Sequence, residues 1–182
     1  MAEKKGYRIT AAQNLSGSWY VNFLNHPSLG DNVTQYVGRY CRELKGVMKI
    51  TFRLTAQPTS YSPELRMMIV RMNKPMTSVG MLPDITEILK DPTSWGVSAY
   101  NRAFCPRIYR ILFDRVIILA GQNGSGDPNH WIRILRFNFR NRLLRFGEYT
   151  EITQGGPIYI LVIANETVIQ MQYDWTFYFT DT

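Results

Sequence analysis

The chain has 182 residues, 45% of them hydrophobic and 13% aromatic, and a formal net charge of +7. This length fits one domain over residues 1–182, with a sizeable core, better than two domains. No stretch approaches the roughly 20 apolar residues of a membrane-spanning helix or the apolar core of a signal peptide, so we expect a soluble protein made in the cytosol, away from membranes.

Most segments between the frequent Pro and Gly residues alternate apolar and polar side chains, which predicts strands with one buried face. The alternation is clearest at Lys45–Thr55 (KGVMKITFRLT). Leu65–Asn73 is apolar on both faces and is expected near the centre of a sheet. Helical signal is confined to Pro83–Leu89, where one or two turns are expected with Asp84 as the N-terminal cap.

Two longer segments follow. Arg107–Ala120 is long enough for one extended strand, or for two strands joined at a kink near Asp114. Within Trp131–Asn141 the apolar positions change parity between Ile134 and Leu135, which predicts a β-bulge at that step. Beyond the bulge, the outer face is expected to carry Arg136, Asn138 and Arg140, with Arg142 just after them.

The last two segments differ in pattern. Pro157–Ala164 is apolar on both faces and is predicted to be a fully buried strand, whereas Met171–Thr182 alternates and has one aromatic face. Together the segments predict an all-β domain of about eight antiparallel strands in two sheets, with little helix. Residues 1–15 form a short, weakly basic N-terminal segment. The strand pattern alone leaves a β-sandwich and a jelly roll open.

The positive charge is concentrated in one segment. Between Tyr100 and Phe146 nine arginines stand against two acids, which accounts for the whole net charge of +7. Guanidinium groups pair bidentately with phosphates, so a basic surface facing a polyanion is one interpretation. The other interpretation is that these arginines lie on solvated strand faces or form ion pairs between subunits. The residues expected to contact nucleic acid are Lys4, Lys5, Arg8, Arg136, Arg140 and Arg142.

No motif in the sequence predicts catalysis, a cofactor or a metal site. His26 and His130 are too few and too far apart for the ligand cluster of a metal-dependent cupin. Glu148 and Glu151 would lie on opposite faces of an extended chain, so they do not form a catalytic pair. The loop Gly121–Asn129 is similar to a phosphate-binding loop only in composition, because a strand rather than a helix is expected after it.

Four passages occur in a recognisable order: GDNVTQYVGRYCRELKGVMKITFRL at 30–54, LRMMIVRMNK at 65–74, RIYRILFDRVIIL at 107–119, and GPIYILVI at 156–163 followed by the aromatic C-terminal strand. In this order they resemble the capsid proteins of circoviruses and related circular single-stranded DNA viruses that encode a replication protein. The resemblance implies a structural protein of the virion, not an enzyme. It implies one jelly roll that assembles with copies of itself into a small icosahedral T=1 shell around single-stranded DNA.

One departure limits what the resemblance implies. Such capsid proteins usually begin with a long Arg/Lys-rich arm that enters the shell, neutralises the genome and carries the nuclear import signal. Here only Lys4, Lys5 and Arg8 stand in its place. Three explanations stay open: the arm was removed, the folded inner face takes its role, or DNA is not packaged in the usual way. Localisation in the host nucleus is open for the same reason.

Three alternative functions stay open as well. A β-sandwich recognition module, lectin-like or cytokine-like, would form a small oligomer without nucleic acid. An enzyme on a jelly roll would need a deep pocket with converging polar groups. The capsid of a small RNA or satellite virus would fit the same residues, because nothing in them separates DNA from RNA.

Overall fold

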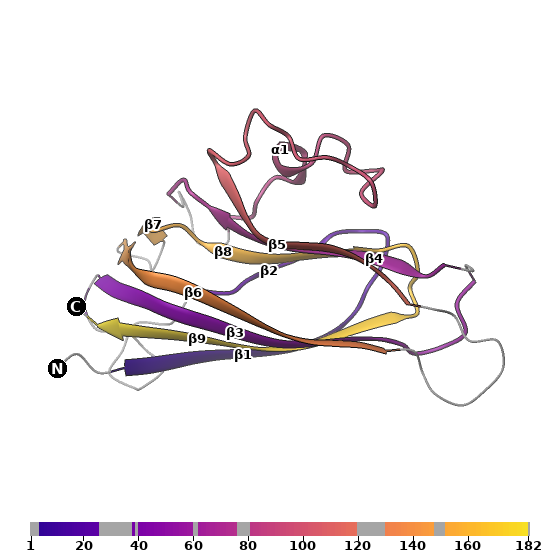
Figure 1. Cartoon of the computed structure of the whole chain (residues 1–182), viewed down its shortest axis with the longest axis horizontal. Coiled ribbons are helices and arrows are strands. Elements are labelled where there is room, and N and C mark those ends of the chain that lie inside the picture. The colour runs from indigo at the N-terminus through magenta and orange to yellow at the C-terminus, as the bar shows by residue number, and fades with distance from the viewer. Residues whose placement is uncertain are drawn as a thin grey trace.

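The computed structural model of the chain consists of two antiparallel β-sheets stacked face to face (Figure 1). It describes residues 4–25, 38, 40–59, 62–75, 81–119, 130–147 and 152–181. One short helix, α1 (Ile85–Ile88), accompanies the sheets. The five-stranded sheet has the order β1 (Lys4–Asn14), β9 (Ile169–Asp181), β3 (Tyr40–Leu54), β6 (His130–Phe146) and β7 (Ile152–Gln154). The four-stranded sheet has the order β2 (Tyr20–Phe23), β8 (Ile158–Ala164), β4 (Glu64–Met72) and β5 (Tyr109–Ile118).

The order in which the strands pair defines a jelly roll. β1 pairs with β9, β2 with β8, β3 with β6 and β4 with β5, all antiparallel, so the chain is one long hairpin rolled into two sheets. The short strand β7 is an addition beside β6. Jelly rolls made of two Greek keys have this arrangement. The pairing therefore selects the jelly roll from the two all-β folds that the strand pattern left open.

The core is built from the inward faces of the alternating strands. On β9, Trp175, Phe177 and Phe179 are completely buried, while the residues between them are half-buried. The ring of Phe137 on β6 lies 5.9 Å from that of Trp175. A Cβ atom on Gly46 of β3 would lie 2.0 Å from Trp175 Cη2. The indole therefore fills space that a larger residue at this position would take.

A long connection between β4 and β5 covers the outer side of the four-stranded sheet (Figure 1). It contains α1, which begins directly after the predicted cap. Asp84 Oδ1 accepts a hydrogen bond from the backbone N–H of Thr86 at 2.8 Å. The expected turns at Pro83–Leu89 are thus confirmed, and they belong to the layer that shields this sheet from solvent.

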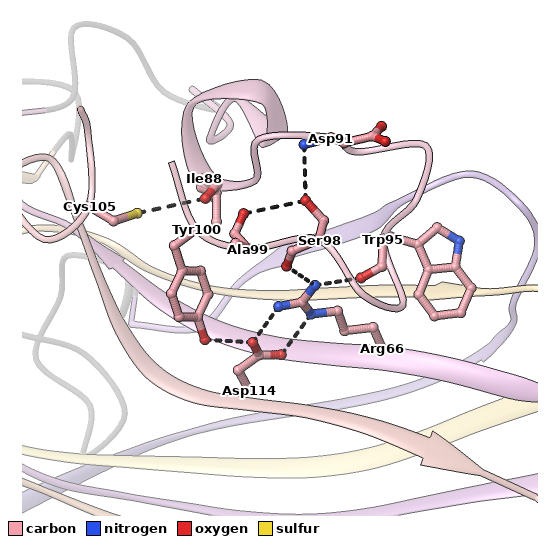
Figure 2. Close-up of polar contacts among 9 residues, drawn as sticks. All are labelled: Arg66, Ile88, Asp91, Trp95, Ser98, Ala99, Tyr100, Cys105 and Asp114. Carbon is pink, nitrogen blue, oxygen red and sulfur yellow. Dashed lines mark hydrogen bonds and ion pairs between the residues drawn. The ribbon is translucent and has the colours of Figure 1, made fainter. Parts of the chain in front are cut away.

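Arg66 of β4 fixes this connection to the sheet, as Figure 2 shows. Its guanidinium donates two hydrogen bonds to the carboxylate of Asp114 on β5, at 2.9 and 2.6 Å. Its Nη1 donates to the carbonyl oxygen of Ser98 at 2.9 Å, and the hydroxyl of Tyr100 donates to the same carboxylate of Asp114. Arg66 is only 6% exposed. β4 lies between two strands and beneath this connection, which is why its sequence is apolar on both faces.

The segment around Asp114 forms one continuous strand. Of the two arrangements that the sequence allowed, a single extended strand is the one observed, as β5. Its pairing with β4 shifts register opposite Ile69 and Val70, close to Asp114. The expected irregularity is therefore present, but it is absorbed within the strand and does not divide it.

The β-bulge predicted between Ile134 and Leu135 is wrong. Ile134 pairs with Lys49 and Leu135 with Met48 in unbroken register. Ile132 and Ile134 are 43% and 51% exposed on the outer face of the sheet. An isoleucine on a solvent face cannot be told from a core isoleucine in the sequence. The two exposed isoleucines therefore produce an apparent change of parity in the apolar pattern, although the strand itself alternates without interruption.

The bulge of β6 lies further along the strand. The register with β3 shifts between Glu43 and Lys45. On the β6 side, Arg140 and Asn141 have φ angles of 54° and 57°, and Asn138 Oδ1 accepts a hydrogen bond from the backbone N–H of Arg140 at 2.9 Å. Left-handed φ angles are uncommon for residues other than glycine. The bulge therefore stands among the arginines that the sequence singled out.

Candidate functional site

Two of the three cations predicted near the N-terminus are paired within the chain. All three lie on β1, the edge strand of the five-stranded sheet. Lys5 is 4% exposed, and its Nζ lies 2.6 Å from Oδ2 of Asp181. Arg8 is exposed, and its Nε donates to Oδ1 of Asp174 at 2.8 Å, a contact that lowers the pKa of that carboxyl. The charges of Lys5 and Arg8 are therefore already balanced by β9.

Among the described residues, the outer face of the five-stranded sheet is exposed and basic. The Nζ atoms of Lys4 and Lys45 lie 5.2 and 4.7 Å from the ring centre of Tyr178. Lys4, Lys45 and Arg136 line one hollow of about 330 Å³. Basic residues around an aromatic ring are the combination that single-stranded nucleic acid binding uses. Within the described residues, this face carries one carboxylate, that of Asp174. Its cations include Lys4, Arg8, Arg42, Lys45, Lys49, Arg53 and Arg136.

Three predicted arginines meet at the bulge of β6. Arg136, Arg140 and Arg142 line a pocket of about 360 Å³. Arg71 of β4 and Arg110 of β5 reach it from the other sheet, and we call the space among these five residues the arginine pocket. Arg71 and Arg110 are direct cross-strand partners. Like charges directly opposite each other destabilise a strand pair. The carboxylate of Glu43 balances the charge of Arg71, whereas among the described residues no carboxylate lines the pocket beside Arg110.

Arg71 is held in place by a buried network that joins the two sheets. Its Nη1 donates to Oε2 of Glu43 on β3 at 2.6 Å and to the carbonyl oxygen of Gly155 at 2.9 Å. Oε1 of Glu43 accepts a hydrogen bond from Nδ2 of Asn25 at 2.8 Å. Glu43 and Asn25 are completely buried, and Arg71 is 2% exposed. The other terminal nitrogen of Arg71, Nη2, is buried without a hydrogen-bond partner among the described residues.

Burial dominates the electrostatics of this region. It lowers the pKa of Arg142, and the neighbouring charge of Arg71 lowers that pKa further. It raises the pKa of Glu43 even though Arg71 is adjacent. Both shifts reflect the free energy of removing a charged group from water. Within the described residues the lining of the arginine pocket contains no carboxylate, so the arrangement favours the binding of an anion.

Sequence reasoning did not select Arg71, Arg110 and Lys45, which line the two basic hollows, as candidate site residues. Arg71 lies outside the arginine-rich segment, in a strand that was expected to be apolar on both faces. That environment was itself a usable signal, because a charged residue in a buried strand needs a partner or a ligand. Lys45 begins the most regular alternating segment and lies on its outer face, but only the strand pairing brings it next to Lys4.

The remaining sequence predictions concern other kinds of site. In the part of the chain that the structure describes, no group of three or more His, Cys, Asp or Glu side chains could hold a metal ion. Over the same residues, no helix is long and apolar enough to cross a membrane. His130 lies exposed at the start of β6. The predictions for His26, Glu148, Glu151 and Gly121–Asn129 fall outside the described residues.

No protein-family model and no curated protein matches the chain. Among solved structures, it is similar to a chain of desmodium yellow mottle tymovirus, with 11% identity and a TM-score of 0.43, over 100% of this chain and 89% of that one. It is also similar to a chain of the infectious bursal disease virus VP2 subviral particle, with 9% identity and a TM-score of 0.33. That match covers 98% of this chain and 33% of the other.

Proposed function

We propose that the chain is a viral capsid subunit that assembles with copies of itself into a small icosahedral shell around a single-stranded DNA genome. Two independent features support the proposal. The first is the resemblance of four sequence passages to capsid proteins of circular single-stranded DNA viruses. The second is the jelly-roll pairing of the strands, which the strand pattern had left undecided. A rigid block made of two stacked sheets suits a function that depends on shape.

The observation that carries the proposal is the difference between the two outer faces of the sandwich. The face of the four-stranded sheet is covered by the connection between β4 and β5, which Arg66 and Asp114 hold in place. The face of the five-stranded sheet carries basic side chains. A subunit of a closed shell needs such a difference, because one side meets a polyanion and the other meets solvent. We therefore assign the five-stranded sheet to the interior.

Contacts between copies are expected at the free edges of the sandwich. Among the described residues, β5 is the last strand of its sheet, and β6 pairs with β7 only through Arg145 and Phe146. Apolar side chains are exposed on both strands: Val116 and Ile118 on β5, and Ile132 and Ile134 on β6. Exposed apolar groups beside unpaired strand edges are typical of association sites. Head-to-tail contacts of this kind close into rings and shells when the rotation between copies is suitable.

Electron microscopy of the purified protein in negative stain, with the ratio of absorbance at 260 and 280 nm, tests the proposal. Closed shells that carry nucleic acid are the expected result, and digestion of the extracted material with DNase and RNase identifies it. RNA in the shells would contradict the DNA genome and indicate the capsid of a small RNA virus. Empty shells would contradict packaging by this chain. Small discrete oligomers would refute the capsid function and favour a recognition module.

The basic face makes a second, quantitative test possible. For single strands, log Kobs falls with log salt by about 0.7 for each phosphate contact. The double variant Lys4→Gln with Lys45→Gln should therefore flatten the salt dependence of oligonucleotide binding by about 1.4. The control, Lys90→Gln with Arg102→Gln, removes two exposed cations from the connection on the opposite side. Equal effects of both variants would contradict the assignment of the interior face.

A further inference from the structure

The arginine pocket is built by an unusual piece of backbone. The bulge of β6 holds Arg140 at a φ of 54°, a conformation that glycine adopts far more readily than arginine. Bulges commonly redirect side chains next to functional sites. Residues held in a sparsely populated backbone conformation by the surrounding structure cluster at functional sites. Here the strained residue adds a guanidinium to a pocket that four other arginines also line.

Among the described residues, one arginine that lines the pocket has an unsatisfied hydrogen-bond donor. Nη2 of Arg71 is buried and has no hydrogen-bond partner among the described residues, although the same guanidinium donates through Nη1 to Glu43 and Gly155. Buried donors in native proteins are nearly always paired. Arg71 is 2% exposed, so the side chain cannot turn to solvent without breaking the buried network. The guanidinium carbon of Arg71 also lies 4.9 Å from the ring centre of Phe139, and both residues line the pocket. An anion in the pocket therefore adds an acceptor beside a guanidinium whose hydrogen-bonding capacity the described residues do not fully use.

We propose that the arginine pocket is a discrete binding site for one phosphate group in each subunit. Guanidinium forks match the oxygen atoms of phosphate and bind them bidentately. The volume of about 360 Å³ leaves ample room for a phosphate group. A doubly charged anion relieves the repulsion that remains among Arg71, Arg110 and Arg142 beside the single carboxylate of Glu43. It also places acceptor oxygens beside the guanidinium of Arg71, which lines the pocket.

The phosphate has two possible sources, free phosphate and the backbone of a nucleic acid. The second source rests on the proposed function, and in that case the pocket fixes one nucleotide of the packaged strand to each subunit. The first source does not depend on packaging. Both sources require the same guanidinium chemistry, so the existence of the site can be tested separately from the identity of its occupant.

Calorimetric titration of the protein with inorganic phosphate, at constant ionic strength, tests the site. One phosphate should bind per chain. Arg110→Gln and Arg142→Gln should each weaken binding about tenfold or more, since hydrogen bonds to charged groups are strong. Arg115→Gln is the matched control, because Arg115 lies exposed on the same strand as Arg110 but outside the pocket lining. No saturable binding by the unmodified protein, or equal weakening by Arg115→Gln, overturns the proposal.

Arg140→Gly separates binding from folding. Glycine relieves the left-handed conformation, so this variant should melt at the same temperature as the unmodified protein or higher, yet bind phosphate more weakly. Unchanged phosphate affinity in this variant would count against a role for Arg140 in the site.

A competition experiment identifies the source. If a short single-stranded oligonucleotide binds less tightly in the presence of phosphate, and Arg110→Gln abolishes this effect, the pocket takes a backbone phosphate. Independent binding of the two ligands assigns the pocket to free phosphate. Shells that package nucleic acid without any phosphate binding would refute this site and leave the capsid function standing. Phosphate binding without shells would do the reverse.

Discussion

Substitution of Gly46 by alanine is expected to destabilise the fold strongly, although only one methyl group is added. A Cβ atom at this position would lie 2.0, 2.6 and 2.8 Å from three carbons of the Trp175 ring. Carbon atoms in contact lie about 3.5–4.0 Å apart, so the indole would have to move by about 1.5 Å. Trp175 is completely buried, and its Nε1 donates to the carbonyl oxygen of Leu24 at 2.6 Å. Burial and this hydrogen bond both oppose movement of the ring.

The magnitude follows from three contributions. Overpacking of a core costs about 1–3 kcal/mol, and loss of the buried hydrogen bond from Trp175 costs about 1 kcal/mol more. Alanine recovers about 0.4–1 kcal/mol by restricting the unfolded chain. The free energy of unfolding should therefore fall by about 2–3 kcal/mol.

Urea denaturation followed by far-ultraviolet circular dichroism measures this change. The control is Gly17→Ala, because a Cβ atom at Gly17 meets nothing within 4 Å. The double variant Gly46→Ala with Trp175→Phe should lose less than the sum of the two single variants, since a smaller ring leaves room for the methyl group. If Gly46→Ala were no less stable than Gly17→Ala, the close approach of β3 and Trp175 would be refuted.

Three further changes test other parts of the structure. Asp114→Ala should lower the free energy of unfolding by about 3–5 kcal/mol and expose residues 81–108 to limited proteolysis, because it leaves the guanidinium of Arg66 buried without its carboxylate; unchanged proteolysis would contradict that anchoring. Burial raises the pKa of Glu43 above its ordinary value of 4.5, so the native state binds this proton more tightly and loses stability as the pH rises from about 4.5 through the raised pKa. Relative to the unmodified protein, Glu43→Gln should therefore gain stability over that range in denaturation series at several pH values, and a relative loss would contradict this sign. Ile132→Ser with Ile134→Ser should change stability by less than about 0.5 kcal/mol, as exposed positions usually do, and should reduce assembly measured by sedimentation; shells of normal yield would exclude these residues from the contact between copies.

The sequence by itself determined the local structure of most strands. Alternation identified the inward face of β3 and β9, and continuous apolar runs identified β4 and β8 as buried on both sides. The cap at Asp84 marked the start of α1. These features are short-range, because side-chain direction in a strand repeats every two residues and a cap acts on the next turn. The buried strand faces and the helix cap can therefore be identified without knowing which strands pair.

Only the tertiary structure decided which strands pair and which charges meet. Ile132 and Ile134 led to the wrong position for the bulge, because the sequence does not record whether an apolar side chain faces the core or solvent. Lys5 was expected at a nucleic acid, but the register of β1 against β9 places it beside Asp181. Arg71 joins Arg140 only when the two sheets stack, since these residues lie in different sheets and far apart in the chain. Such encounters depend on the packing of the whole chain, which a local pattern cannot encode.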